Sequence, residues 1–109
     1  MEKQSIGSFI QYRERRFSKV NIFEGEDVTT FVLNLLPGQR MPEHYHLGSH
    51  LYFLVIQGNG KFIISGEEIN VEAGDTIHID GTEKVGFMNT GDGPANIYVT
   101  MCKLKQEVL

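Results

Sequence analysis

Short apolar stretches alternate with turn residues along the whole chain, and this pattern predicts strands rather than helices. No long window has apolar residues at the three- and four-residue spacing of an amphipathic helix, and 12 glycines punctuate the chain. The strands predicted from this pattern cover residues 8–12, 19–23, 28–36, 40–46, 51–56, 61–65, 68–71, 76–79, 85–89 and 95–104. About ten short strands at near-regular spacing predict an all-β fold, either an antiparallel sandwich or a barrel.

The turns between these strands carry signals of their own. Pro37-Gly38 ends the third predicted strand, because proline cannot donate to a β-ladder. Asn59-Gly60 lies between two hydrophobic runs, which is the strongest short-range signal for a β-hairpin. The run 51–56 is apolar at both alternations, which predicts that both faces of this strand are buried.

Three of the four histidines, His44, His46 and His50, fall within seven residues of sequence. His44 and His46 are two residues apart, so their side chains point to the same face of an extended strand. His78 alternates with two isoleucines, and a lone histidine in a strand is more often a hydrogen-bonded structural residue than a ligand. The sequence therefore places a metal-competent cluster directly before the strand 51–56.

The segment from Gly38 to Gly58 resembles the first motif of the cupin family. That motif has a glycine, five residues, His-x-His, three or four residues, a glutamate, six residues and a closing glycine. Here five residues separate Gly38 from His44-Tyr45-His46, and Gly58 closes the segment.

Residues 66–92 resemble the second cupin motif, in which a glycine, five residues and Pro-x-Gly precede a histidine and an asparagine. Here Glu72 stands at the proline position, and Asn89 matches the asparagine. Together the motifs resemble a single-domain cupin over residues 1–109, with motif one around residues 38–58. The resemblance implies a small antiparallel jelly-roll β-barrel.

In the cupin family, the metal ligands are the two histidines and the glutamate of motif one and the histidine of motif two. His44 and His46 match the first two positions. Counting three residues from His46 places His50 at the glutamate position, whereas counting back from the closing glycine places Leu51 there. We favour His50, because imidazole and carboxylate both bind mid-series divalent metals. At the motif-two histidine position, the chain has Val85.

The resemblance therefore predicts a divalent metal ion, Zn, Fe, Mn or Ni, held by His44, His46 and His50 at the mouth of the barrel. Water or substrate would complete its coordination shell. The alternative is a barrel that has lost its metal, in which the histidines are the polar lining of a pocket.

Family members include dioxygenases, isomerases and decarboxylases, so the first functional hypothesis is metal-dependent chemistry on a small molecule. The second hypothesis is a non-catalytic sensor or carrier of a small molecule, and the third is a metal-free dimeric interaction barrel. No catalytic acid or base stands out beside the histidines, so whether the chain is an enzyme stays open. The resemblance also implies a homodimer, formed through the outer face of the strand 51–56.

Composition and charge narrow the partners and the compartment. The net charge of −4 argues against nucleic acid as a partner. Arg13, Arg15 and Arg16 form the basic cluster of the sequence, and we expect them to protect an edge strand from pairing. No run approaches the ~18 apolar residues of a membrane span. Cys102 is the only cysteine, which excludes an internal disulfide and favours a cytoplasmic location.

Overall fold

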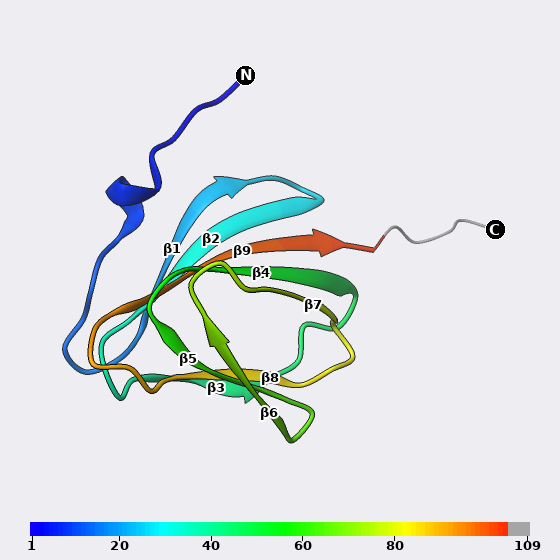
Figure 1. Cartoon of the computed structure of the whole chain (residues 1–109). Helices are drawn as coiled ribbons and strands as arrows, with labels where there is room; N and C mark the ends of the chain where they lie inside the picture. Colours follow the sequence, from blue (N-terminus) through cyan, green and yellow to red (C-terminus); the bar gives the residue numbers. More distant parts are fainter. Residues whose placement is uncertain (105–109) are drawn as a thin grey trace.

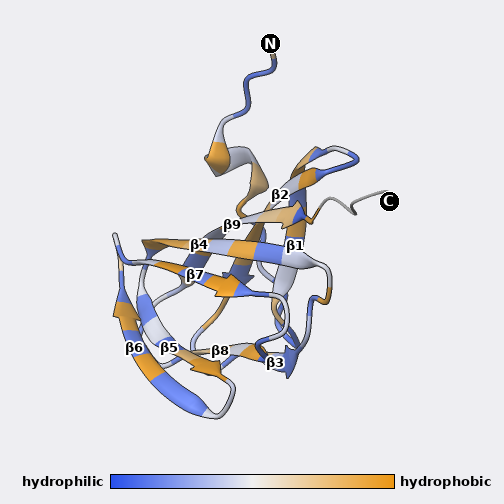
Figure 2. Cartoon of the chain, turned by 90° about the vertical axis from the view of Figure 1, so that its right-hand side faces the viewer, coloured by the Kyte–Doolittle hydropathy of each residue, from blue (hydrophilic) through white to orange (hydrophobic). Residues whose placement is uncertain are grey.

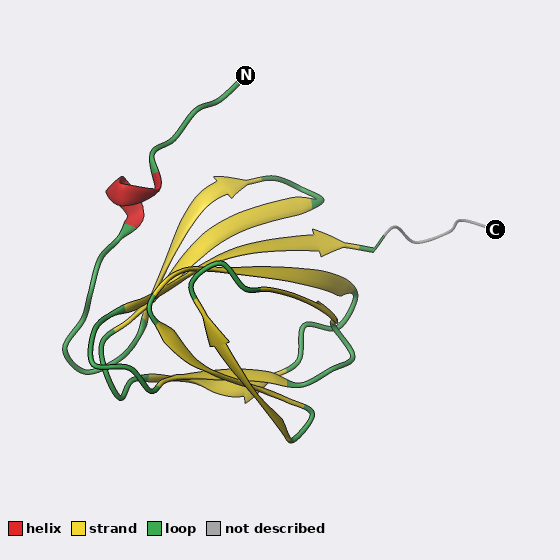
Figure 3. Ribbon diagram, viewed as in Figure 1, coloured by secondary structure: helices red, strands yellow, loops and turns green. Residues whose placement is uncertain are grey.

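The computed structural model describes residues 1–104, which fold into two antiparallel β-sheets packed face to face (Figure 1). The predicted domain extends to residue 109, and residues 105–109 lie outside the described part. The elements are η1 (Ile6–Phe9), β1 (Ser18–Glu24), β2 (Val28–Leu35), β3 (Arg40–His44), β4 (Ser49–Gln57), β5 (Asn59–Ile64), β6 (Glu67–Glu72), β7 (Thr76–Asp80), β8 (Val85–Asn89) and β9 (Ala95–Lys103). The prediction of an all-β antiparallel fold is confirmed (Figure 3).

The larger sheet has the strand order β1-β2-β9-β4-β7, and the smaller sheet has the order β3-β8-β5-β6. Every strand pair within the two sheets is antiparallel. In Figure 1 the larger sheet forms the upper layer and the smaller sheet the lower one. β1 and β3 are edge strands of different sheets, and the pocket described below lies between them.

The core fills the space between the sheets, because each strand buries alternate side chains. Leu51, Phe53 and Val55 of β4 are buried, whereas Tyr52 and Leu54 are exposed. The same alternation of hydrophilic and hydrophobic residues is visible along β6 in Figure 2. Other buried residues of the core are Phe31, Leu33, Leu35, Met41, Phe62, Ile64, Val71, Ile79, Val85, Phe87, Ala95, Ile97 and Val99.

Three phenylalanines join the two sheets at the centre of this core. Phe53 of the larger sheet lies 5.0 Å from Phe62 of the smaller sheet, and Phe62 lies 4.9 Å from Phe87, measured between ring centroids. The rings are inclined by 57° and 62°, close to the edge-to-face arrangement that aromatic pairs prefer. These contacts fix the spacing of the sheets beneath the pocket.

The predicted strand over residues 8–12 is wrong: η1 and an irregular loop occupy this part of the chain. Here the backbone bonds to polar side chains of the larger sheet instead of to another strand. Asn34 Nδ2 donates to the carbonyl oxygen of Phe9 at 3.0 Å, and Ser18 Oγ donates to that of Gln11. η1 is the only helical segment in residues 1–104, and no helix there is long and apolar enough to cross a membrane.

Candidate functional site

A narrow pocket of about 70 Å³ opens between the edge strands of the two sheets, and we call it the mouth pocket. Its lining combines three basic side chains with an apolar wall. The basic residues are Lys19, His44 and His46. The apolar residues are Phe17, Phe31, Leu33, Met41, Leu51 and Phe53. The pocket can therefore receive a polar group at one side and carbon atoms at the other.

The two mouth-pocket histidines are held by different parts of the chain. His44 ends β3, and its Nδ1 lies 2.8 Å from the carbonyl oxygen of Pro42. His46 lies on the loop after β3, where its amide donates to the carbonyl oxygen of Gly81 at 3.2 Å. The two rings are 4.4 Å apart between centroids and meet edge to face. The expectation that His44 and His46 share one face agrees with this arrangement.

His50 lies on the opposite face of β4 from the mouth pocket. Its Nδ1 is 2.9 Å from Nε2 of His78, which lies on the neighbouring strand β7. The neighbouring residue Leu51 is 1 % exposed and lines the mouth pocket beside His44 and His46. Because successive side chains of a strand point to opposite faces, Leu51 takes the position that we assigned to His50. The structure therefore places Leu51, and not His50, beside His44 and His46.

Val85 occupies the place opposite His44 in the pairing of β3 with β8. It is fully buried and contributes no donor atom. Both remaining positions around the two histidines, Leu51 and Val85, are therefore aliphatic. Within residues 1–104, no three histidine, cysteine, aspartate or glutamate side chains are grouped so that they could hold a metal ion.

Lys19 and Phe17 are functional candidates that the sequence interpretation missed. Lys19 lies on β1, and its Nζ is 4.3 Å from the centre of the Phe31 ring on β2. Both residues are more than 20 positions away from the histidines in the sequence. Their only local signal is a lysine inside a run of apolar strand residues, which by itself is typical of an exposed edge strand.

The electrostatics of the mouth pocket keep His46 neutral more readily than an ordinary histidine. Partial burial is the main cause that lowers the pKa of His46 from its usual value of 6.5. The nearby charges of His44 and Lys19 lower it further. A neutral imidazole can accept a proton or a hydrogen bond at neutral pH.

We expect the folded protein to lose stability below pH 6.5 through His46. Since the pKa of His46 is lower in the folded protein, the unfolded chain binds more protons as the pH falls through this range. The free energy of unfolding therefore decreases between pH 6.5 and the folded pKa. Urea unfolding on both sides of this range measures the slope, and histidine NMR titration measures the pKa. His46→Gln should reduce the slope, and the control His78→Gln should retain it.

Comparison with protein families identifies the fold family of the chain. The Cupin domain family matches residues 31–101, which is more than half of the chain. The chain is a cupin. This agrees with the resemblance read from the two motifs, and the match includes His44, His46, Leu51 and Val85.

Individual proteins are similar to this chain at sequence identities below 30%. The tetracenomycin polyketide synthase protein TcmJ of Streptomyces glaucescens is 29% identical over 65 residues, which are 60% of this chain and 44% of TcmJ. The match thus spans less than half of that relative. The solved structure of TT1209 from Thermus thermophilus has a TM-score of 0.89 at 23% identity and covers 96% of this chain and 100% of TT1209. An RmlC-like cupin from Desulfovibrio desulfuricans has a TM-score of 0.84 at 21% identity, covering 94% and 96% of the two chains. At this identity the two structures establish the fold alone.

Cupins often bind a metal ion, but the residues of this cupin do not fit the family's ligand set. Two of the four ligand positions carry His44 and His46, while the other two carry Leu51 and Val85. The third histidine that we predicted as a ligand, His50, is paired with His78 on the outer face. Divalent metals of this series need more than two protein donors for a stable site. The chemistry of the mouth pocket therefore rests on its own side chains.

Proposed function

We propose that this cupin binds a small organic molecule through an acidic oxygen, a carboxylate or an enolate, in the mouth pocket. The observation that carries the proposal is that Lys19, His44 and His46 line an otherwise apolar pocket, with Lys19 and His44 close enough to His46 to lower its pKa. Among residues 1–104, no carboxylate side chain lines this pocket. An anionic oxygen of the ligand would supply the missing partner for Lys19 and accept hydrogen bonds from the imidazoles.

The size of the pocket limits what can enter it. A volume of about 70 Å³ admits the polar end of a molecule and a few carbon atoms. Phe31 and Phe53 offer flat apolar surfaces to that carbon part. The rest of the ligand would remain at the surface between β1 and β3.

Binding of benzoate, followed by NMR, tests the proposal. We expect saturable shifts of the His44 and His46 imidazole signals, together with a rise in the pKa of His46 as the anion binds. Lys19→Gln should weaken the affinity for benzoate at least about fivefold, because it removes a charge-assisted hydrogen bond. Lys61→Gln, on the smaller sheet, removes the same charge elsewhere and should leave the affinity unchanged. Equal weakening by both variants, or shifts outside the mouth pocket, would contradict the proposal.

Proton transfer on the bound molecule is a second candidate function, and the lowered pKa of His46 favours it. A neutral imidazole beside a cationic lysine can remove an acidic C–H proton while the lysine stabilises the enolate oxygen. The likeness to a protein named for a polyketide synthase adds support, because polyketides carry such acidic C–H groups. Deuterium exchange into acetylacetone measures this reaction directly. If the His46→Gln variant still accelerates the exchange above the uncatalysed rate as much as the wild type does, His46 is not the base.

We further propose that this cupin forms a homodimer through the outer face of the larger sheet. Tyr52 and Leu54 are 48% and 39% exposed there, although the strand is apolar on both faces. With Ile77 and Tyr98 they line a shallow hollow of about 250 Å³. A second copy of the chain would bury this surface.

Tyr52→Glu is expected to weaken the homodimer at least about tenfold, because it places a charge in an apolar interface. Sedimentation velocity over a dilution series measures the dissociation constant. Tyr45→Glu is the matched control, since Tyr45 is 55% exposed on the loop after β3. A wild-type monomer at all concentrations would refute the dimer.

A further inference from the structure

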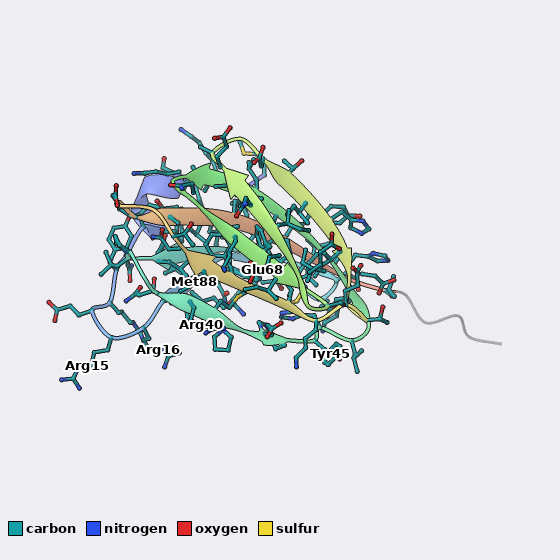
Figure 4. All side chains as sticks on the ribbon, turned by 60° about the horizontal axis from the view of Figure 1, so that its bottom comes forward. Arg15, Arg16, Arg40, Tyr45, Glu68 and Met88 are labelled. Carbon is teal, nitrogen blue, oxygen red and sulfur yellow. The ribbon has the colours of Figure 1, made fainter. Side chains whose placement is uncertain are left out.

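Three of the four arginines of the chain surround one hollow next to the mouth pocket. Arg15 and Arg16 are on the loop before β1, and Arg40 begins β3 (Figure 4). The hollow has a volume of about 510 Å³, and we call it the basic pocket. Its remaining lining is Phe17, Gly38, Gln39 and Pro42, so none of the described residues that line it is acidic.

No ion pair within residues 1–104 neutralises the charges of the basic pocket. Within residues 1–104, the one ion pair joins Lys61 and Glu68 on the smaller sheet, far in sequence from these arginines. Protection of the edge strands β1 and β3 accounts for exposed arginines taken singly. It does not account for arginines from two separate elements that line one hollow together with Phe17 and Pro42. Like charges that line one hollow repel one another, and an anion bound between them would offset this repulsion.

The turn between β2 and β3 holds the basic pocket in shape. Gln39 Nε2 donates to the carbonyl oxygens of Arg13 at 2.6 Å and Glu14 at 3.3 Å. Gln39 Oε1 accepts from the Leu36 amide at 2.9 Å. Gly38 has a φ of 81°, which a residue with a side chain rarely adopts. One glutamine thus ties the arginine-bearing loop to the turn through hydrogen bonds within the protein.

We infer that the basic pocket binds the phosphate group of a small molecule. Guanidinium groups match the oxygens of phosphate in paired hydrogen bonds, and they keep their charge at any physiological pH. Phe17 and Pro42 provide apolar surface for the carbon atoms next to the phosphate.

Phe17 also lines the mouth pocket, so its side chain forms a wall common to both pockets. A phosphorylated molecule held by Arg16 and Arg40 can therefore extend past Phe17 towards Lys19 and the two histidines. This extension rests on the proposed function, whereas phosphate binding in the basic pocket stands without it. Together they define the ligand class as a small phosphorylated organic acid or ketone.

Titration with pyrophosphate and with inorganic phosphate at physiological salt tests the inference. We expect saturable NMR shifts confined to residues 15–17 and 38–42. The double variant Arg16→Gln/Arg40→Gln should weaken the affinity for pyrophosphate at least about tenfold. It removes one guanidinium group from the loop before β1 and one from β3. Arg13→Gln is the matched control, since it removes the same charge from the same loop outside the pocket lining. It should change the affinity by no more than about twofold.

Three outcomes would overturn the inference. One is a response that does not saturate, and another is equal weakening by Arg13→Gln and by the double variant, because both indicate general charge attraction. The third is binding of citrate as tight as that of pyrophosphate, because the pocket would then recognise negative charge rather than phosphate. His44→Ala/His46→Ala should retain pyrophosphate binding. Pyrophosphate binding in the basic pocket can therefore be found even if the mouth-pocket proposal fails. Benzoate binding in the mouth pocket can likewise be found even if the basic pocket binds no phosphate.

Discussion

Leu51→Glu combined with Val85→His is expected to turn the mouth pocket into a site that holds close to one Zn²⁺ or Ni²⁺ per chain. Leu51 lines the pocket beside His44 and His46, and Val85 lies opposite His44 in the strand register. The two substitutions would therefore add a carboxylate and an imidazole around the existing pair. Four such donors are the set that mid-series divalent metals bind firmly.

The double variant should also make stability depend on metal. Its new carboxylate and imidazole would replace the buried aliphatic side chains of Leu51 and Val85. Without metal, the double variant should therefore lose about 3 kcal/mol or more of unfolding free energy. A metal ion at about a hundred times its dissociation constant would restore about 2.7 kcal/mol. Elemental analysis after dialysis measures the stoichiometry, and thermal unfolding with and without metal measures the stabilisation.

Further variants separate the two ligand assignments. Adding His50→Ala to the double variant should leave metal binding unchanged, because His50 faces the outer surface and pairs with His78. Adding His44→Ala should weaken metal binding, because only three of the four donors remain. The wild-type protein should retain no stoichiometric metal. If the wild-type protein retains metal and the His50→Ala variant loses it, the three-histidine site predicted from the sequence is correct. His50 would then face the mouth pocket rather than pair with His78.

The misplacement of His50 has a specific physical origin. A strand buries every second residue, so a shift of one position exchanges its inner and outer faces. In most strands the polar residues reveal which face is outside. From Leu51 to Ile56 both alternations are apolar, so the pattern does not distinguish the series that contains His50 from the series that contains Leu51. The packing of the sheet decides which series faces inward. β4 pairs with β7 and β9 so that Leu51, Phe53 and Val55 face the core.

The strands could be predicted from the sequence better than the pocket could. Strand periodicity and turn residues act over a few positions, and nine of the ten predicted strands have a counterpart in β1 to β9. The pocket instead depends on β1 and β3, which are edge strands of different sheets. Lys19 and Phe17 reach His44 only because the two sheets pack together. Such contacts are not encoded in local spacing, so the motif residues were recognised and their partners were not.

Gly81→Ala is expected to lower the free energy of unfolding by about 2–4 kcal/mol and to displace the loop that carries His46. A Cβ at Gly81 would overlap the carbonyl oxygens of His46 and Ser49. These are backbone atoms, so a side-chain rotation cannot relieve the overlap. The Gly81 amide also donates to the Ser49 carbonyl oxygen at 2.7 Å, and the His46 amide donates to the Gly81 carbonyl oxygen at 3.2 Å. Any movement that makes room for the methyl group must stretch both hydrogen bonds.

The same substitution tests how His46 is positioned. If the loop shifts, His46 becomes more exposed and moves away from Lys19, so its lowered pKa should return towards 6.5. Urea unfolding measures the loss of stability, and NMR titration of His46 measures the pKa. Gly93→Ala is the matched control, because nothing lies within 4 Å of a Cβ there. Loss of stability with an unchanged His46 pKa would mean that the loop after β7 absorbs the strain, and that the imidazole keeps its place in the mouth pocket without the contact between His46 and Gly81.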